Sequence, residues 1–184
     1  MLILASASKA RLELLKSVGI SPDKIISTNI NEKPKKDEKP LDYVLRIALE
    51  KNKAVKKNSS DIVLSADTIV SVGRRILLKP NNIDEASDFL SLLSGRRHRV
   101  HTSICIFYNH KFYQKNITTI LKMKRLSDEE KKSYLKSQEW RGKAGGYAIQ
   151  GRAAQYIKQI SGSYSNVVGL DLYTTAKLLR GVGF

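Results

Sequence analysis

The stretch Asp61-Ile62-Val63-Leu64-Ser65-Ala66-Asp67-Thr68-Ile69-Val70 decides the fold that this sequence predicts. Small and apolar residues follow Asp61 and predict a buried strand, and the same character resumes at Ile69. Asp67 and Thr68 interrupt this run with a carboxylate and a hydroxyl. Because an unpaired buried carboxylate is costly, Asp67 needs a metal ion, a cation or several donors beside it. Asp67 either finishes a strand or belongs to a catalytic site, and similar polar interruptions elsewhere favour the catalytic site.

The chain before this strand predicts a site for an anion. Residues 1–5 are apolar and predict a short strand, and Gly19 ends a helix that begins near Arg11. Ser6 and Ser8 lie between strand and helix, where hydroxyls cap a helix whose free N–H groups attract anions. Arg11 in the first turn is poorly placed unless an anion binds there too. The alternative is ordinary capping beside a surface arginine.

A second helix is predicted over residues 41–55. Leu41, Val44 and Ala48 follow helical spacing, with Leu45 beside them. Lys51 comes three residues after Ala48 and therefore lies on the same inward face. It either extends outward to solvent or contacts a negative group, and the second role is favoured.

The rest of the chain contains further strand and helix patterns. A hairpin turns at Gly73, and Pro80 holds Lys79 extended. Strands are expected through Tyr108 and over residues 117–123, and capped helices begin at Asn82, at Ser127 and before Leu172. Residues 20–40 are expected to form a polar connection. No linker divides the chain, so residues 1–184 are predicted to form one domain.

Two glycine-bearing segments complete the pattern. Trp140 to Gly151 contains four glycines and several large apolar side chains, so it predicts a packed loop whose backbone can approach a ligand. Gln150 could reach that ligand. Gly162 to Gly169 is expected to be another loop, rich in hydroxyls.

The charge balance is strongly basic. Lys and Arg number 33 against 17 Asp and Glu, which gives a net charge of +16. This excess suits a polyanionic partner, either a nucleic acid or a small phosphorylated ligand. It equally suits a lysine-rich solvated surface, because the cations are spread along the chain.

Cysteine content, the start of the chain and the length of its apolar runs bear on cellular location. The one cysteine, Cys105, lies in an apolar run and is expected to be a buried thiol. No basic leader precedes the short apolar start, and no run approaches the roughly 18 apolar residues of a membrane span. A cytoplasmic protein without a membrane partner is expected.

Several segments resemble the motifs of the Maf family of nucleoside triphosphate pyrophosphatases. They are Leu4-Ala5-Ser6-Ala7-Ser8-Lys9-Ala10-Arg11, Tyr43-Val44-Leu45-Arg46-Ile47-Ala48 with Lys51, Ala66-Asp67-Thr68-Ile69-Val70, Lys79-Pro80, Leu93-Ser94-Gly95 with His98, Val100 and Thr102, Gly142 to Gly151, and Gly162 to Leu170. These segments occur in the family's order and span nearly the whole chain. Together they are highly specific.

The resemblance implies a mixed α/β fold, with an elongated central sheet flanked by helices and a substrate cleft. It implies hydrolysis of nucleoside triphosphates to the nucleoside monophosphate and pyrophosphate, assisted by a divalent cation, Mg²⁺ or Mn²⁺. The favoured substrates are dTTP and UTP, and modified pyrimidine nucleotides are further candidates. Family members are often dimeric, so a homodimer is one expected assembly.

The resemblance also assigns site residues. The residue matching Asp67 is the proposed general base, and Asp67 and Glu32 match the acids of the metal site. Lys51 and Lys79 match residues that contact phosphates.

Arg11, Thr68 and Gln150 match the specificity positions of the branch that acts on dTTP and UTP. A branch acting on 7-methyl-GTP places Trp and Glu at two of these positions. Asn31 stands where the family usually has Asp, so one acid near the metal is missing. Leu78 and Asp171 replace a common Gly and a common Pro, and no proposed catalytic group is lost.

The chemistry of these residue types agrees with the resemblance. Attack on the α-phosphorus needs a positioned water, neutralised phosphate charge and a stabilised leaving group. Lys51, Lys79 and the turn from Ser6 to Arg11 supply positive charge and donors. Gln150 can match the adjacent O4 and N3–H of uracil or thymine, although an amide also pairs with adenine.

Two other classes of function compete with hydrolysis. A basic nucleic-acid-binding protein should cluster basic and aromatic residues, whereas here single polar groups interrupt apolar faces, so no stable nucleic-acid complex is expected. A regulatory interaction protein in cell division is the other alternative.

Overall fold

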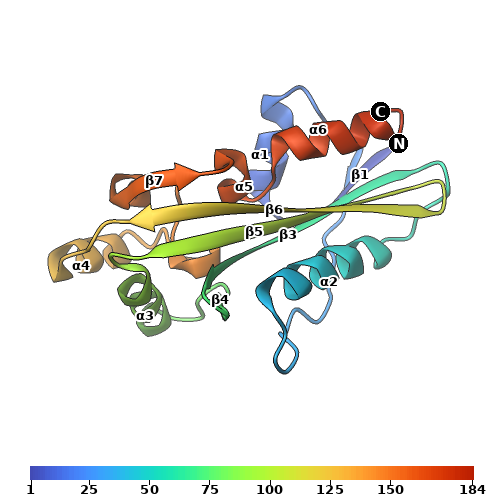
Figure 1. Ribbon diagram of the computed structural model, residues 1–184. Helices are drawn as coiled ribbons and strands as arrows, with labels where there is room; N and C mark the ends of the chain where they lie inside the picture. The colour runs from blue at the N-terminus through green and yellow to red at the C-terminus, as the bar shows by residue number, and fades with distance from the viewer. The chain divides into compact units, whose positions relative to one another are not determined.

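The computed structural model describes residues 1–184 and shows a mixed seven-stranded sheet flanked by helices (Figure 1). The strands follow the order β2-β1-β3-β5-β6-β7, and β4 pairs with β3. Their bounds are β1 Leu2–Ala5, β2 Lys24–Ile25, β3 Ile62–Val72, β4 Arg75–Leu77, β5 Arg97–Tyr108, β6 Lys111–Met123 and β7 Ile157–Ser161. The predicted mixed α/β class is confirmed.

Helices connect most of these strands. Their bounds are α1 Lys9–Ser17, α2 Pro40–Lys53, α3 Ile83–Leu93, α4 Asp128–Lys136, α5 Tyr164–Val168 and α6 Leu172–Gly181, with short 3₁₀ turns η1 Ala144–Gly146 and η2 Arg152–Tyr156. No helix combines the length and the apolar character needed to cross a membrane.

The chain forms two compact units. The first unit comprises Met1–Thr68, Thr102–Ile117 and Gly169–Phe184, and the second comprises Ile69–His101 and Thr118–Val168. Strands β3, β5 and β6 contribute residues to both units.

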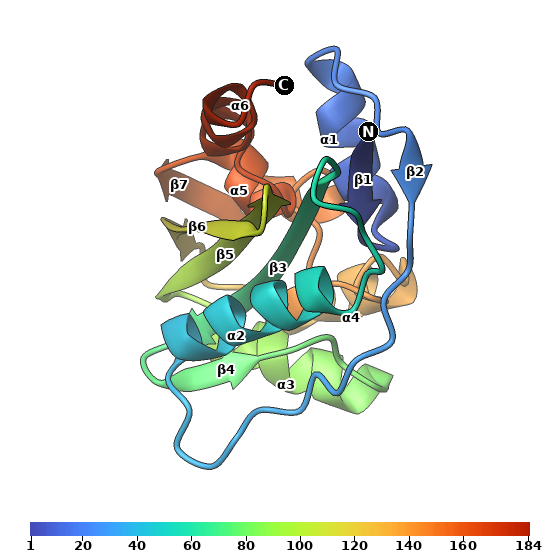
Figure 2. The same cartoon turned by 90° about the vertical axis from the view of Figure 1, so that its right-hand side faces the viewer.

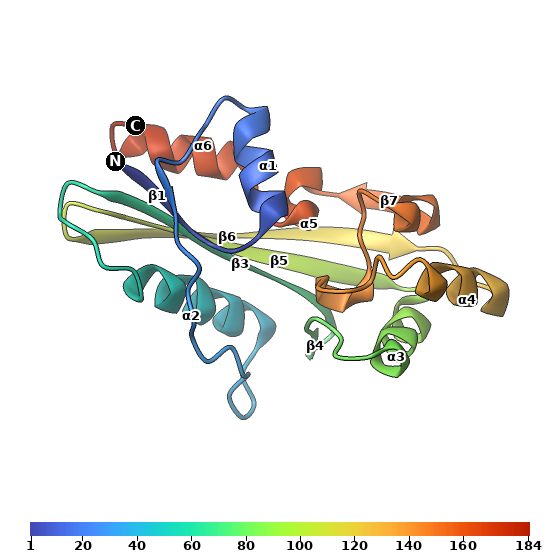
Figure 3. The same cartoon turned by 180° about the vertical axis from the view of Figure 1, so that it is seen from behind.

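The first unit is a sheet covered on both faces (Figures 2 and 3). β1 runs parallel to β3, with Leu2 opposite Ile62. Both strands consist mainly of apolar residues, which allows the parallel pair to be buried on both faces. Helices α1 and α6 cover one face, where Leu15 and Leu179 pack on the strands. Helix α2 lies on the opposite face.

The second unit is built around the end of β3 and the glycine-rich loop. The predicted hairpin is confirmed, because β3 turns at Gly73 into antiparallel β4. Helix α3 contacts both α4 and η1. Apolar side chains from all of these segments form one core, which includes Phe89, Leu121, Trp140 and Ile149.

Local signals in the sequence located most helix ends correctly. Asn82 accepts from Glu85 N at 2.8 Å, and Ser127 with Glu130 forms a full capping box. Leu41 was expected on the inward face of α2, but it is 43% exposed. It occupies the first turn, and the buried stripe runs from Pro40 through Tyr43 and Val44 instead.

Three short elements differ from the expected pattern. The expected connection over residues 20–40 contains β2, and the expected loop over residues 162–169 contains the five-residue helix α5. Strand β7 was not predicted, because four of its five residues are exposed and pairing with β6 holds it in place.

Candidate active site

In the first unit, the Ser6–Arg11 turn runs from the end of β1 into the first turn of α1. Ser8 is the N-cap of α1 and accepts a hydrogen bond from Arg11 N at 3.4 Å. Ser6 is buried, and its Oγ accepts from Ser8 N at 3.2 Å. This is the predicted strand–turn–helix arrangement, with capping hydroxyls where a helix attracts anions.

Arg11 is not a surface residue, although it stands in the first turn of an amphipathic helix. Its side chain is 8% exposed and donates through three different nitrogens. Nε donates to Gly169 O at 2.8 Å, one Nη donates to Ser6 Oγ at 3.1 Å, and the other donates to Thr68 Oγ1 at 3.1 Å. Burial lowers the pKa of Arg11, while the charges of Asp67 and Glu32 raise it. Arg11 therefore joins the first turn, the central strand and the segment before α6.

Thr68 is part of the same network. Its Oγ1 donates to Gly169 O at 3.2 Å and lies 2.9 Å from Thr102 Oγ1 on β5. The threonine hydroxyl thus links Arg11 to β5 and to the segment before α6. It explains why a polar residue follows Asp67 inside an apolar strand.

Asp67, Lys51 and Glu32 form the charged centre of this unit. Lys51 Nζ lies 2.7 Å from Asp67 Oδ1 and 2.9 Å from Glu32 Oε1. Lys51 is 8% exposed and Asp67 is 6% exposed. The predicted inward position of Lys51 is confirmed. The cation that a buried Asp67 requires is this lysine.

Burial raises the pKa of Asp67, and the charges of Lys51 and Arg11 oppose that rise. A carboxylate whose pKa moves toward neutrality is a better proton acceptor than an ordinary surface aspartate, because its affinity for the proton is higher. The same residue is held rigidly by its bond to Lys51. Asp67 is therefore suited to take a proton from a water molecule.

The residues present fit a divalent metal that binds together with phosphates. No group of three or more His, Cys, Asp and Glu side chains could hold a metal ion alone. Asp67 and Glu32 are nevertheless joined through a single lysine, so their oxygens lie close together. Mg²⁺ is commonly bound by one or two carboxylates plus substrate phosphates and water. These two acids match that donor set.

Lys79 and Gln150 belong to the second unit. Both residues are exposed, Lys79 two positions after the end of β4 and Gln150 in the glycine-rich loop. Gly145 N donates to Leu78 O at 3.0 Å, so the loop is bonded to the residue that precedes Lys79. Gly145 has φ +70°, and a Cβ there would meet Val70 at 2.7 Å, so only glycine fits.

One contact that holds this loop in place is not predicted by the sequence. His98 Nε2 lies 2.7 Å from Tyr147 Oη, and both rings are buried. His98 and His101 do not form a metal pair. Instead, His101 lies between Ser71 Oγ at 3.0 Å and Thr118 Oγ1 at 2.8 Å. The only signal for the His98 contact was the position of both residues in motif segments.

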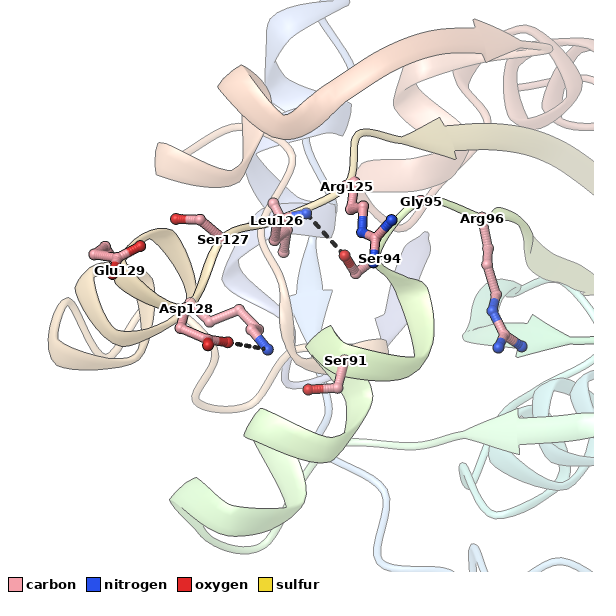
Figure 4. Close-up of a pocket in the computed structure, with 10 residues that line it drawn as sticks. Ser91, Ser94, Gly95, Arg96, Arg125, Leu126, Ser127, Asp128 and Glu129 are labelled. Atoms are coloured by element: carbon pink, nitrogen blue, oxygen red, sulfur yellow. Dashed lines mark hydrogen bonds and ion pairs between the residues drawn. The ribbon is translucent and has the colours of Figure 1, made fainter.

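A pocket of about 810 Å³ lies in the second unit, between the end of α3 and the start of α4 (Figure 4). Arg96 and Arg125 line it together with an ion pair between Asp128 and Lys131. None of the predicted site residues lines this pocket. The first turn of α4 lines this pocket and is acidic, and it includes Glu129. These negative charges oppose the binding of an anion at the start of α4.

Comparison with known proteins supports the family that the motif segments resemble. The family model described as "Maf-like protein" matches residues 1–182. The chain belongs to the Maf family. This Maf chain is 50% identical over 182 residues to the dTTP/UTP pyrophosphatase of Ruegeria sp., covering 99% of this chain and 94% of that protein. It is 51% identical over 184 residues to the dTTP/UTP pyrophosphatase of Roseobacter denitrificans, covering 100% and 98%.

A solved structure of a nucleoside-triphosphatase / dITP/XTP pyrophosphatase from Mycobacterium abscessus is a more distant match. It is 12% identical with a TM-score of 0.46, covering 98% of the Maf chain and 94% of that chain. A likeness this distant has no bearing on the site.

Proposed function

We propose that this Maf-family protein hydrolyses dTTP and UTP to the nucleoside monophosphate and pyrophosphate. The observation that carries the proposal is a buried carboxylate, Asp67, paired with the buried Lys51 in a chain that matches the family over residues 1–182. Full-length relatives about half identical to it are named dTTP/UTP pyrophosphatases, which supports the same substrates here. No observation favours the alternatives of a nucleic-acid-binding or a regulatory interaction protein.

Asp67 acts as the general base in this proposal. A water molecule beside its carboxylate loses a proton to it and attacks the α-phosphorus, and pyrophosphate leaves. Burial raises the pKa of Asp67, which favours the proton transfer. Lys51 and the Ser6–Arg11 turn supply positive charge and donors for the phosphates, and Lys79 is assigned the same role. A divalent cation held by Asp67 and Glu32 would add charge neutralisation on the triphosphate.

Base choice is assigned to Arg11, Thr68 and Gln150. Arg11 and Thr68 are bonded to each other and to the carbonyl of Gly169, so their positions are fixed before substrate binds. Gln150 is exposed, and its amide offers the acceptor and donor that the uracil imide edge requires. A single domain, a homodimer and a cytoplasmic location remain predictions.

A pyrophosphate-release screen tests the proposal. The eight common ribo- and deoxyribonucleoside triphosphates would be compared with Mg²⁺ and with Mn²⁺ at equal concentrations. We expect dTTP and UTP to have the highest kcat/KM, with monophosphate and pyrophosphate in equal amounts. Release of orthophosphate and a diphosphate, or a preference for purines, would overturn it.

A further inference from the structure

Lys51 occupies the position between the two carboxylates that are proposed to hold the metal. Its Nζ lies within 2.9 Å of both Glu32 Oε1 and Asp67 Oδ1. The lysine is almost completely buried at the end of α2, so it reaches these acids from a fixed backbone. A divalent cation bound by the same oxygens would place like charge against the buried Nζ.

The charges of this cluster balance without any metal. Arg11 and Lys51 provide two positive charges, and Asp67 and Glu32 provide two negative charges. A metal ion entering this cluster alone would leave it with excess positive charge. Entry together with an anionic triphosphate would not, because the phosphates bring the opposite charge.

We infer that Lys51 is an internal cation that competes with the divalent metal for Asp67 and Glu32, and that the phosphates of the substrate release it. This inference rests on the proposed function, which assigns Lys51 a phosphate contact. A lysine suits the exchange, because its ammonium is a compact charge on a flexible four-carbon stem. When Nζ turns to a phosphate, both carboxylates become available. Metal and substrate therefore bind with positive coupling.

The metal affinity of the free protein tests the competition. Mn²⁺ alone would be titrated calorimetrically into the wild type, Lys51→Met and the control Lys53→Met. Lys53 is exposed two positions later on the same helix, so its loss removes the same charge outside the cluster. Lys51→Met should bind Mn²⁺ at least about tenfold more tightly than the wild type. Lys53→Met should stay within about twofold, because exposed charges are screened. Equal Mn²⁺ affinity of Lys51→Met and the wild type would overturn the inference.

A second measurement needs no variant. Reductive methylation followed by mass spectrometry would compare the labelling of each lysine in the wild type with and without saturating Mn²⁺. Lys51 should be protected in the free protein and should become more reactive when Mn²⁺ displaces it, while Lys53 should not change. Unchanged labelling of Lys51 at saturating Mn²⁺ would contradict displacement. Neither measurement involves turnover, so a protein that releases no pyrophosphate yet shows both effects would overturn the proposed function and retain the competition between Lys51 and the metal.

Discussion

The two units bury polar groups in opposite ways. The first buries charges, namely Arg11, Lys51 and Asp67, each bonded to a partner. The second buries neutral rings, among them His98 against Tyr147, beside a continuous apolar core. Buried charges are costly even when paired, whereas buried neutral hydrogen-bonded groups cost little.

The difference indicates that the first unit binds a charged ligand and that the second unit holds a loop in place. A network of buried charges is a poor way to stabilise a fold, because apolar residues of similar size would often serve as well. Its presence in the first unit is explained by a charged ligand. The neutral contacts of the second unit instead fix the backbone of the loop that carries Gln150. Variants should therefore separate chemistry from stability.

The largest effect should come from Asp67→Asn. The amide is nearly isosteric but cannot accept the proton, so kcat should fall by at least about 100-fold. Stability should change little, because the variant also loses a carboxylate that is costly to bury. Asp61→Asn is the matched control: Asp61 is equally buried near the start of β3 and accepts a backbone bond from Asn58. Steady-state kinetics in which both variants lost kcat alike would make Asp67 a structural residue.

Arg11→Met should destabilise the first unit. It removes three hydrogen bonds of a buried side chain, to Gly169 O, Ser6 Oγ and Thr68 Oγ1, which should lower the free energy of unfolding by about 2–4 kcal/mol. Urea denaturation measures this loss. The exposed Arg180 at the end of α6 provides a control, and Arg180→Met should change stability by less than about 0.5 kcal/mol. Equal losses would mean that the Arg11 network contributes nothing specific.

Acid should weaken the second unit through His98. Burial lowers the pKa of His98 to about 4, whereas an unfolded histidine titrates near 6.5. Between these values the unfolded state binds more protons, so the free energy of unfolding falls as the pH drops from about 6.5 to 4. His98→Gln should remove roughly 3 kcal/mol of that pH dependence. The exposed His110 is the control, and an unchanged pH profile in His98→Gln would show that the neutral ring pair has no such role.

The smallest effect should be a change in base choice. Gln150→Glu removes the amide donor and places a carboxylate opposite a carbonyl of uracil or thymine, so kcat/KM for UTP should fall at least about tenfold. GTP, whose edge offers two donors, should lose less or gain. Gln155→Glu adds the same charge at an exposed position nearby in sequence and should leave the UTP to GTP ratio unchanged. A uniform loss for dTTP, UTP and GTP in Gln150→Glu would mean that this residue only holds the loop.

Much of the fold could be predicted because its signals are local. The strand around Asp67, the inward face at Lys51 and the Ser127 cap each depend on residues within a few positions. Strands β2 and β7 could not be predicted, because their short sequences are exposed and only pairing with neighbouring strands defines them.

The site was partly predictable for the same reason. The sequence required a cation or metal beside Asp67, and motif resemblance named Lys51, but nothing in the spacing showed that Lys51 would join Asp67 to Glu32. The bond from Arg11 to Gly169 O spans 158 positions, so no local pattern could reveal it.

The most direct test of the central claim locates the bond that breaks. UTP would be hydrolysed in ¹⁸O-labelled water, and the products would be identified by ³¹P NMR and mass spectrometry. Attack at the α-phosphorus predicts one labelled oxygen in UMP and unlabelled pyrophosphate. Label in pyrophosphate, or the appearance of UDP and labelled orthophosphate, would contradict the account.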